Sequence, residues 1–356
     1  MDRIGIFLES LSLEDTFRFA KLADENNFDS IWLPEITWSD AFSLATAAAM
    51  STKKVKLATG VVGIYGRSPA LMAMSVAGLD ELSGGRAILG LGTQARPYVE
   101  LWHSAKFERP VTRMKEYVQA LRKILENPFG VTYFKGKVFD IKGFVLTVKP
   151  KSPHIPIYVA AIGPQLQRVA GQVADGVLGY FYSLRYVKEK LIPNLKEGAE
   201  KSGRDLKKKN FDIAVGFPAL IDDSEDRYEK IKPLVAVFTV ATGSSKSYQT
   251  ILADLGFSEN IEIITRKMHE GDVQGAVKHI PDEMAREVTL CGTAREVRER
   301  IQEFRNAGVT LPLPNPTPPY AYYPLFPTHL PDKLAAGSVD YAGLRDQVER
   351  IITSLK

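Results

Sequence analysis

The feature that most constrains this chain is a regular alternation of short apolar runs with longer amphipathic stretches. The first hundred residues hold four such pairs, and their apolar runs are RIGIFLE, FDSIWLPE, VKLATGVV and RAILGLG, at residues 3–9, 28–35, 55–62 and 86–92. Runs that are apolar along their whole length are typical of parallel strands covered by helices on both faces. The alternation therefore predicts an α/β fold with a parallel sheet.

The stretch between the third and fourth runs predicts a helix over residues 69–83. Pro69 suits the first helical turn, because its missing N–H would have no partner there. Gly84 and Gly85 end the helix, and the chain then re-enters the sheet. Another helix is predicted over residues 40–51.

The first predicted helix follows the first apolar run. Ser12 and Asp15 fit a capping box at its start. Apolar residues then recur at helical spacing and predict the buried face, which consists of Leu13, Phe17, Ala20 and Ala23.

The rest of the chain continues the alternation after one interruption, a small β insertion at 130–151 with turns at 135–136 and 142–143. Further strands are expected at 155–164, 176–181, 211–221 and 309–314. Helices are expected at about 111–127, 164–174, 186–202, 289–308 and 341–355, and residues 225–290 are mainly helical. Eight strands with intervening helices predict a (β/α)8 barrel, the TIM-barrel fold, in a single domain of residues 1–356. An open doubly wound sheet is the alternative.

Composition excludes several classes of function. The formal net charge of +4 over 356 residues is too weak to indicate nucleic-acid binding. The single cysteine, Cys291, excludes an internal disulfide, and the five histidines lack metal-ligand spacing, so no metal site is expected. No apolar run approaches the roughly 20 residues of a membrane span. The N-terminus begins as a strand without a leader pattern, so we expect a cytoplasmic protein that does not bind membranes.

The working face of a (β/α)8 barrel is formed by the C-terminal ends of its strands. The residues at these ends are Glu9, Glu35, Gly60, Val61, Val62, Gly63, Thr93, Gln94, Ala160, Ala161, Ile162, Gly163, Pro164 and Gly179. The glycine-rich, apolar ends suit a large flat ligand lying against backbone. Glu9 and Glu35 are candidate catalytic groups, either as a carboxylate pair or as contacts to a bound ring.

The fifth strand turns through Gly163 and Pro164 directly into a helix. Free N–H groups at a helix start can hold a phosphate, so this turn is a candidate phosphate site; the alternative is an ordinary strand-to-helix turn. Arg185, just after the sixth strand, is a candidate charged donor to the same phosphate. The alternative for Arg185 is a surface arginine at a helix start.

Several motifs occur together and in order: LATGVVGIYGRSPA, GRSPALMAMSVAGLDELSGGRAILGLG, AAIGPQLQRVAGQVADGVL and CGT…AGVT. Together they resemble the bacterial-luciferase-like superfamily, and most nearly its branch that uses the deazaflavin coenzyme F420, which includes methylenetetrahydromethanopterin reductase. The resemblance covers residues 1 to about 313 and the last helix. It implies a barrel with insertions, a homodimer and a flavin-type ring bound at the C-terminal face.

The resemblance also implies roles for particular residues. The end of the third strand would carry a cis peptide bond between Gly60 and Val61, and this backbone would lie against one face of the deazaflavin. The other face would be left to a small-molecule substrate, with hydride passing to or from the ring carbon C5. The turn at 160–164 would lie beside the cofactor phosphate, where Ser183 and Arg185 often assist.

The sequence departs from the reductases at two positions. They commonly show Asp-His after the second strand, where this chain has Glu35 and Ile36, and they carry a glutamate in the first strand where this chain has Phe7. Glu9 lies two residues after Phe7 and therefore points to the same face of the strand, so it is a candidate substitute.

A proline- and aromatic-rich loop at 314–340 precedes the last helix and is a third departure. One interpretation is a surface-packed tail. The other is a lid whose substrate-facing residues would be Tyr320, Tyr322, Tyr323 and Phe326.

These observations leave three hypotheses for function. The first is an F420-dependent oxidoreductase that transfers hydride between the deazaflavin and a small organic substrate. The second is an FMN-dependent luciferase-like monooxygenase, and the third is a non-catalytic flavin-binding protein.

Overall fold

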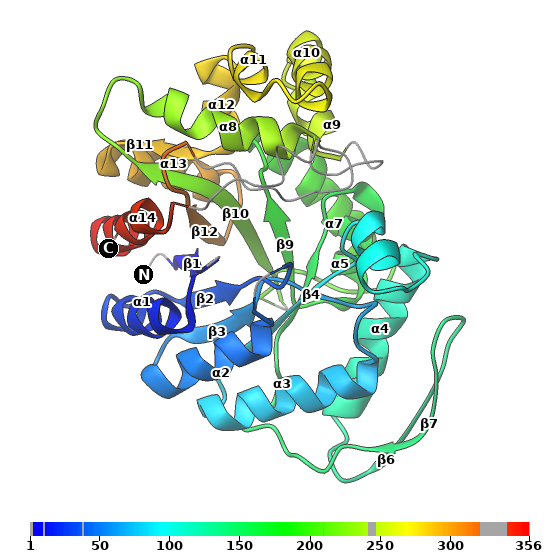
Figure 1. Cartoon of the computed structure of the whole chain (residues 1–356). Coiled ribbons are helices and arrows are strands. Elements are labelled where there is room, and N and C mark those ends of the chain that lie inside the picture. Colours follow the sequence, from blue (N-terminus) through cyan, green and yellow to red (C-terminus); the bar gives the residue numbers. More distant parts are fainter. Residues whose placement is uncertain are drawn as a thin grey trace. The chain divides into compact units, whose positions relative to one another are not determined.

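The computed structural model describes residues 3–9, 11–37, 39–208, 210–240, 247–320 and 340–355 (Figure 1). Its contacts divide the chain into two compact units. The first comprises Met1–Gly179 and Glu189–Ala214, and the second comprises Tyr180–Lys188 and Val215–Lys356. The expectation of a single domain stays a prediction, and each unit is described by itself.

The first unit is built on a parallel sheet. Its strands are β1 (Gly5–Phe7), β2 (Ser30–Leu33), β3 (Lys56–Thr59), β5 (Ala87–Gly92), β8 (Ile157–Ala160) and β9 (Gly176–Tyr180), hydrogen-bonded in that order, with β4 (Val62–Gly63) beside β5. All of these pairs are parallel, as the apolar runs predict. The third predicted strand, at 55–62, is divided into β3 and β4.

Helices follow the strands of the first unit in turn. They are α1 (Leu13–Glu25), α2 (Ala41–Ser51), α3 (Pro69–Ser83), α4 (Pro110–Leu125), α5 (Pro164–Val173) and α7 (Ile192–Glu200), with a π-helix η1 at Tyr98–Trp102. The predicted bounds of α3 are confirmed, and Gly84 and Gly85 end it with φ angles of 72° and 90°. These left-handed angles are the reason for glycine at both positions.

The cap of α1 is confirmed, but its predicted buried face is partly wrong. Ser12 Oγ accepts the Asp15 N–H at 3.0 Å. Leu13 and Phe17 are exposed. The buried face is instead formed by Asp15, Thr16, Phe19, Ala20 and Ala23. The buried face of α1 therefore shares Ala20 and Ala23 with the prediction and differs from it earlier in the helix.

Aromatic side chains fill the core of the first unit. Trp32 on β2 is completely buried, and its ring contacts Tyr158 on β8 edge-on at 5.2 Å between centroids. Phe7 on β1 lies 6.4 Å from Trp32 on the same measure. Near the starts of the strands, Arg3 forms ion pairs with Asp29 and Asp212.

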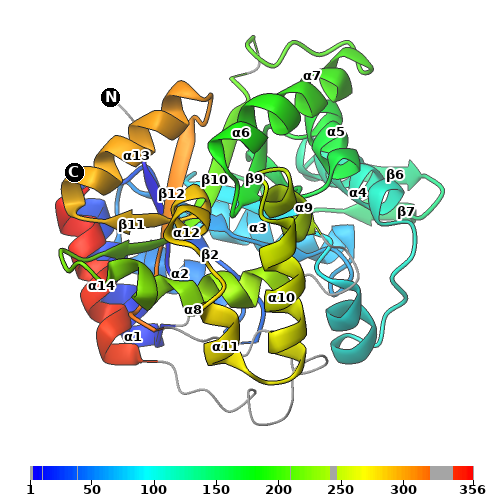
Figure 2. The same cartoon turned by 90° about the horizontal axis from the view of Figure 1, so that it is seen from above.

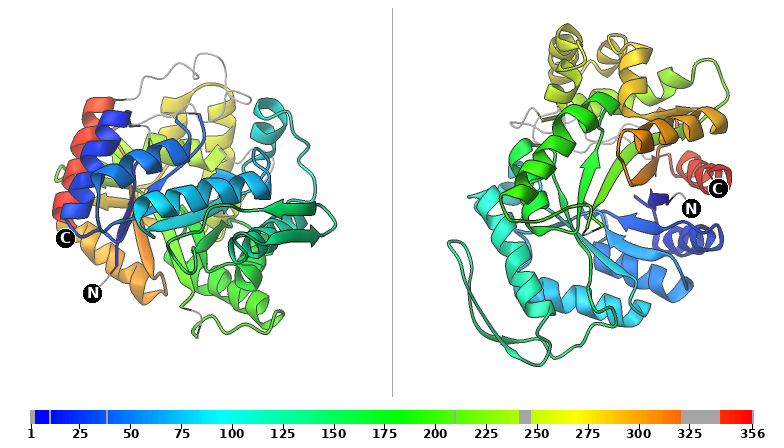
Figure 3. Two further views of the ribbon diagram at one scale, coloured as in Figure 1. Left: turned by 90° about the horizontal axis from the view of Figure 1, so that it is seen from below. Right: turned by 180° about the vertical axis from the view of Figure 1, so that it is seen from behind.

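The β insertion is a hairpin of β6 (Val131–Lys135) and β7 (Asp140–Val145), which lies beside α4 (Figures 1 and 3). The turn predicted at 142–143 is wrong, because both residues lie within β7. Gly143 has a φ angle of 73°. In the register of the hairpin, Thr132 pairs with Phe144 and Tyr133 pairs with Lys142, so Gly143 lies between two paired residues. It is the extra residue of a β-bulge.

The second unit contains the last strands. The strand β10 (Asp212–Ile221) begins in the first unit and ends in the second, where β11 (Leu290–Gly292) and β12 (Leu311–Pro316) pair with it. The prolines of β12 alternate at 312, 314 and 316, so its missing N–H groups all face one edge. The other edge keeps its donors for pairing.

The helices of the second unit are shorter. They are α6 (Leu184–Tyr186), α8 (Arg227–Val240), α9 (Ser247–Ala253), α10 (Ser258–His269), α11 (Val273–Val277), α12 (Asp282–Val288), α13 (Ala294–Asn306) and α14 (Tyr341–Ser354). A π-helix η2 (Val187–Leu191) joins α6 to α7, so the helix predicted at 186–202 is three consecutive pieces. Figure 2 shows α10 and α11 beside α8.

Two predictions in the second unit are corrected. The helix predicted from residue 289 begins at Ala294, because residues 290–292 form β11. Residues 314–316, assigned to the proline-rich loop, belong to β12. Residues 321–339, with Tyr322, Tyr323 and Phe326, lie outside the described residues, and Tyr320 is exposed. No helix within the described residues is both long and apolar enough to span a membrane.

Candidate functional site

The ends of β2 and β3 are joined through backbone hydrogen bonds. The Gly60 N–H donates to the Leu33 carbonyl at 2.8 Å, and the Glu35 N–H donates to the Val61 carbonyl at 3.3 Å. The peptide bond between Gly60 and Val61 is cis, as expected from the family resemblance. The chain then continues into β4, which pairs with the end of β5.

Glu35 is held by an arginine from the segment between β4 and α3. Arg67 Nη1 donates to Oε1 at 2.5 Å and Nη2 to Oε2 at 3.0 Å, a two-point contact that fixes the carboxylate plane. The Ala41 N–H also donates to Glu35 Oε2, at 3.1 Å. Burial alone would lower the pKa of Arg67, but the Glu35 carboxylate raises it above the usual value. Both oxygens of Glu35 are therefore occupied.

The glycines at these strand ends have a nearer explanation than a ligand. A Cβ on Gly60 would meet Phe7 at 2.8 Å and Trp32 at 3.1 Å, and one on Gly63 would meet the Gln94 amide at 2.3 Å. The space that glycine leaves at Gly60 and Gly63 is filled by the chain's own side chains. These contacts are one reason for glycine at both positions, and the expected flat ligand against this backbone stays a prediction.

Gln94, which follows β5, is the residue that contacts Gly63. It adopts a left-handed backbone with φ 57°, and its Oε1 is buried without a hydrogen-bond partner among the described residues. A buried acceptor without a donor is costly, so this amide oxygen fits a bound group that supplies an N–H or O–H. Thr93 beside it is half-buried.

The turn after β8 is open toward helix α5. Gly163 is the N-cap of α5, no side chain caps this first turn, and a Cβ on Gly163 would have nothing within 4 Å. Pro164 occupies the first helical position and is exposed. Here the predicted arrangement of free first-turn N–H groups is present, and its open space suits an anion.

A buried glutamine holds this turn in shape. Gln167 Nε2 donates to the carbonyls of Ala161 and Ile162 at 3.3 and 3.0 Å, and its Oε1 accepts from Asn194 Nδ2 at 2.8 Å. The Ala161 N–H donates to the Leu178 carbonyl at 3.1 Å, which ties the turn to β9 just before Gly179. Sequence inspection did not identify Gln167, because a glutamine inside a helix carries no distinctive signal.

Glu9 follows β1 and is half-buried. Phe7, at the position where the reductases carry a glutamate, is buried against Trp32. The structure thus gives Phe7 a packing role.

Ser183 and Arg185 belong to the second unit. Ser183 Oγ caps α6 by accepting the Tyr186 N–H at 3.1 Å, and the serine is buried. Arg185 Nη1 donates to the Asp254 carbonyl at 3.0 Å. Nearby, Phe181 stacks on Phe238 with centroids 5.3 Å apart. The predicted role of Ser183 and Arg185 beside a phosphate stays a prediction.

Two features of the first unit were not identified from the sequence. One is the role of Arg67 as partner of Glu35. The other is the segment containing η1: Tyr65 stacks on Phe107 at 5.3 Å between centroids, and Arg113 lies over the Tyr65 ring at 4.5 Å. This segment packs on the residues that follow β4.

No group of acidic, histidine or cysteine residues suited to a metal occurs in the part of the chain that the structure describes.

Parallel strands that alternate with helices are the architecture of the (β/α)8-barrel class. The model of the luciferase-like monooxygenase family matches residues 4–311. The 5,10-methylenetetrahydromethanopterin reductase of Archaeoglobus fulgidus is 31% identical over 318 residues, which are 86% of this chain and 91% of that protein. The chain therefore belongs to the luciferase-like monooxygenase family, and it is an oxidoreductase.

Solved structures confirm the predicted fold. The coenzyme F420-dependent tetrahydromethanopterin reductase from Methanopyrus kandleri matches with a TM-score of 0.79 at 25% identity, covering 100% of this chain and 99% of the other. An F420-dependent secondary alcohol dehydrogenase in complex with an F420-acetone adduct matches with a TM-score of 0.72 at 20% identity, covering 100% and 99%. The second likeness concerns the fold alone.

Proposed function

We propose that this protein is an F420-dependent oxidoreductase that transfers hydride between the deazaflavin C5 and a small organic substrate, in the manner of methylenetetrahydromethanopterin reductase. The observation that carries the proposal is the 31% identity to a reductase of that name over 86% of the chain. A putative coenzyme F420-dependent oxidoreductase of Mycobacterium tuberculosis, 28% identical over 81% of the chain, points to the same coenzyme.

The residues present fit such a coenzyme at two places. The uncapped, open start of α5 at Gly163 offers N–H donors for its phosphate. The unpartnered Gln94 Oε1 offers an acceptor for a ring or ribityl donor. The remaining proposed contacts come from the residues at the strand ends, which are Gly60, Val61, Val62, Gly63, Thr93, Ala160, Ala161, Ile162, Pro164 and Gly179, together with Ser183 and Arg185.

When bound, the coenzyme would supply the hydride chemistry at its C5 position, and the protein would supply orientation and exclusion of water. Glu35, with both oxygens engaged by Arg67 and the Ala41 N–H, is proposed to position the ends of β2 and β4. Glu9 is proposed as the carboxylate that handles a proton at the substrate. The contacts of Glu35 support this division of roles.

The alternative is an FMN-dependent monooxygenase, which the description of the matching family favours. A side-by-side fluorescence titration of the protein with F420 and with FMN separates the two. Binding of F420 at least tenfold tighter than FMN is the expected result. Tight binding of FMN alone would replace the proposal with the monooxygenase.

We also propose a homodimer formed through α2 and α3. Apolar side chains on these two helices are exposed, namely Met50, Leu71, Met74 and Leu82. Exposed apolar side chains on neighbouring helices are typical of interaction sites. Sedimentation velocity should give a species of twice the 39.5 kDa chain mass, and a single species of one chain mass would refute the dimer.

A further inference from the structure

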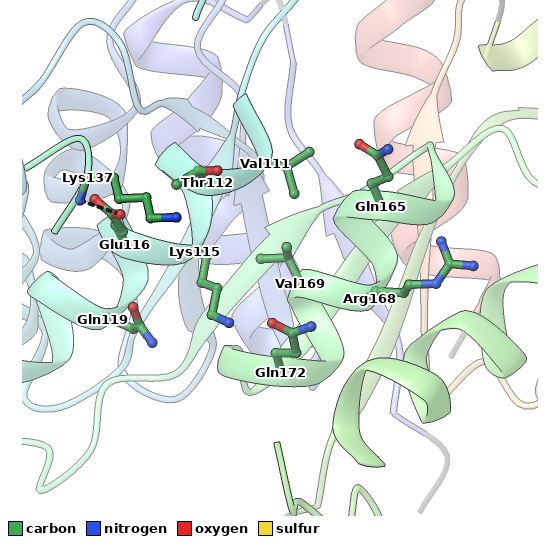
Figure 4. A pocket seen from close by; sticks show the side chains of 10 residues that line it. All are labelled: Val111, Thr112, Lys115, Glu116, Gln119, Lys137, Gln165, Arg168, Val169 and Gln172. Atoms are coloured by element: carbon green, nitrogen blue, oxygen red, sulfur yellow. Dashed lines mark hydrogen bonds between the residues drawn. The ribbon is translucent and has the colours of Figure 1, made fainter. Parts of the chain in front are cut away.

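A pocket in the first unit lies between helices rather than at the strand ends. It has a volume of about 440 Å³ and lies between α4, α5 and the hairpin turn that joins β6 to β7 (Figure 4). Its lining residues are Val111, Thr112, Lys115, Glu116, Gln119, Lys137, Gln165, Arg168, Val169 and Gln172. Apart from two valines, this lining is polar or charged. The pocket therefore combines the aliphatic stems of these side chains with charged and amide groups.

The pocket begins where the proposed phosphate site ends. Gln165, which lines it, is the second residue of α5 and directly follows Pro164. The lining then continues along one face of α5 to Gln172, seven residues on, which is a rise of about 10 Å. On α4 the lining likewise begins in the first turn, at Val111 and Thr112. A ligand anchored at the start of α5 would thus continue into this pocket.

The charges of the pocket favour an anion. Lys115 and Lys137 form no ion pair with any residue that the structure describes, and Figure 4 places both on the α4 side of the pocket. Arg168, on the α5 side, forms an ion pair with Glu197, with Nε 2.5 Å from Oε2. Neither α4 nor α5 has a side-chain cap, so the positive ends of both helix dipoles add to the lysine charges.

The one acid in the lining does not oppose this. Glu116 is buried and its carboxylate accepts the backbone N–H groups of Lys137, Val138 and Phe139 at 2.7, 2.8 and 3.3 Å. Burial alone would raise the pKa of Glu116, but these three N–H donors hold it below the usual value. The carboxylate is thereby used to fix the hairpin turn and to hold Lys137 at the pocket.

We propose that this pocket binds the oligoglutamate tail of coenzyme F420, the part of the coenzyme that continues beyond its phosphate. The proposal rests on the proposed function. Each glutamyl unit carries a carboxylate that Lys115 and Lys137 would pair with, and the 10 Å path along α5 matches about two to three extended residues. FMN ends at its phosphate and would leave the pocket empty.

The test is a set of fluorescence binding titrations at low ionic strength, which need no substrate. Three ligands are compared: F420 with a tail of several glutamates, F420 without glutamates, and FMN. The variant K115E/K137E is compared with K123E/K142E, which makes the same charge change on the same helix and hairpin outside the pocket. Circular dichroism checks that both variants fold, and the single variants K115E and K137E serve if a double variant does not.

We expect the tailed coenzyme to bind the wild type roughly tenfold tighter than the form without glutamates, as two surface charge pairs would give. The difference should vanish in K115E/K137E and at high salt and should persist in K123E/K142E. Equal binding of the tailed and tail-free forms to the wild type, or equal losses in both double variants, would overturn the tail site while leaving the proposed function intact. Failure of both F420 forms to bind would overturn the two together.

Discussion

Arg67 holds Glu35 through both carboxylate oxygens, and the pair joins two loops that sequence analysis treated separately. Glu35 follows β2, whereas Arg67 lies between β4 and α3. The Tyr117 hydroxyl on α4 donates to the Arg67 carbonyl at 2.9 Å. Arg67 therefore joins the loops after two strands through its guanidinium, and its carbonyl connects them with helix α4.

The first prediction separates positioning from proton transfer. The variant E35Q should lower the free energy of unfolding by about 1–2 kcal/mol, because Arg67 loses its charged partner in a half-buried place. Its turnover should fall while the pH profile of kcat/KM keeps its shape. The variant E9Q should instead lose one limb of that profile. Loss of the limb in E35Q with an unchanged profile in E9Q would reverse the two roles.

A second prediction concerns the start of α5. The variant G163D places a carboxylate in the open space at the N-cap, where aspartate is a good cap, so thermal stability should stay equal or rise slightly. The same negative charge should repel a bound phosphate and weaken cofactor affinity by at least about tenfold. The neutral cap in G163S is the control. Equal affinities of G163D and G163S would place the phosphate elsewhere.

The packing of α5 on α7 gives a third prediction. A Cβ on Gly198 of α7 would lie 2.0 Å from the Arg168 carbonyl oxygen, so G198A must push the two helices apart. We expect the free energy of unfolding to fall by about 1–3 kcal/mol. In G78A, inside α3, the new Cβ has nothing within 4 Å, and a gain of up to about 1 kcal/mol is expected. Urea unfolding of both variants measures the contrast, which equal effects would contradict.

A fourth prediction concerns acid stability in the second unit. Burial would raise the pKa of Asp222, but hydrogen bonds from Ser224 and from Lys230, the latter at 2.9 Å, lower it from 3.8 to about 2. Because the folded pKa is the lower one, the ionised form stabilises the fold above pH 4. This contribution, at most about 2 kcal/mol, is lost as the pH falls from about 4 to about 2.

The variant D222N removes that titration. Its stability should fall less steeply than that of the wild type between pH 4 and pH 2, as measured by urea unfolding at a series of pH values. Parallel curves for the two proteins would show that Asp222 titrates normally.

Local chemistry determined the elements of this protein. Pro69, Gly84 and Gly85 delimit α3 without reference to any distant residue, and the apolar runs predict the parallel strands, because a strand covered on both faces must be apolar throughout. The start of α13 was misplaced because Cys291 and its neighbours pair with β10, whose residues lie 71 positions earlier in the chain.

The contacts of the site depended on tertiary structure. The sequence placed Glu35, Gly63, Gln94 and Gly163 at strand ends, because the barrel puts such ends at one face. It did not show that Arg67 binds the Glu35 carboxylate or that the Gln94 amide fills the space beside Gly63. Those facts depend on distances between side chains far apart in the chain, and only packing sets such distances.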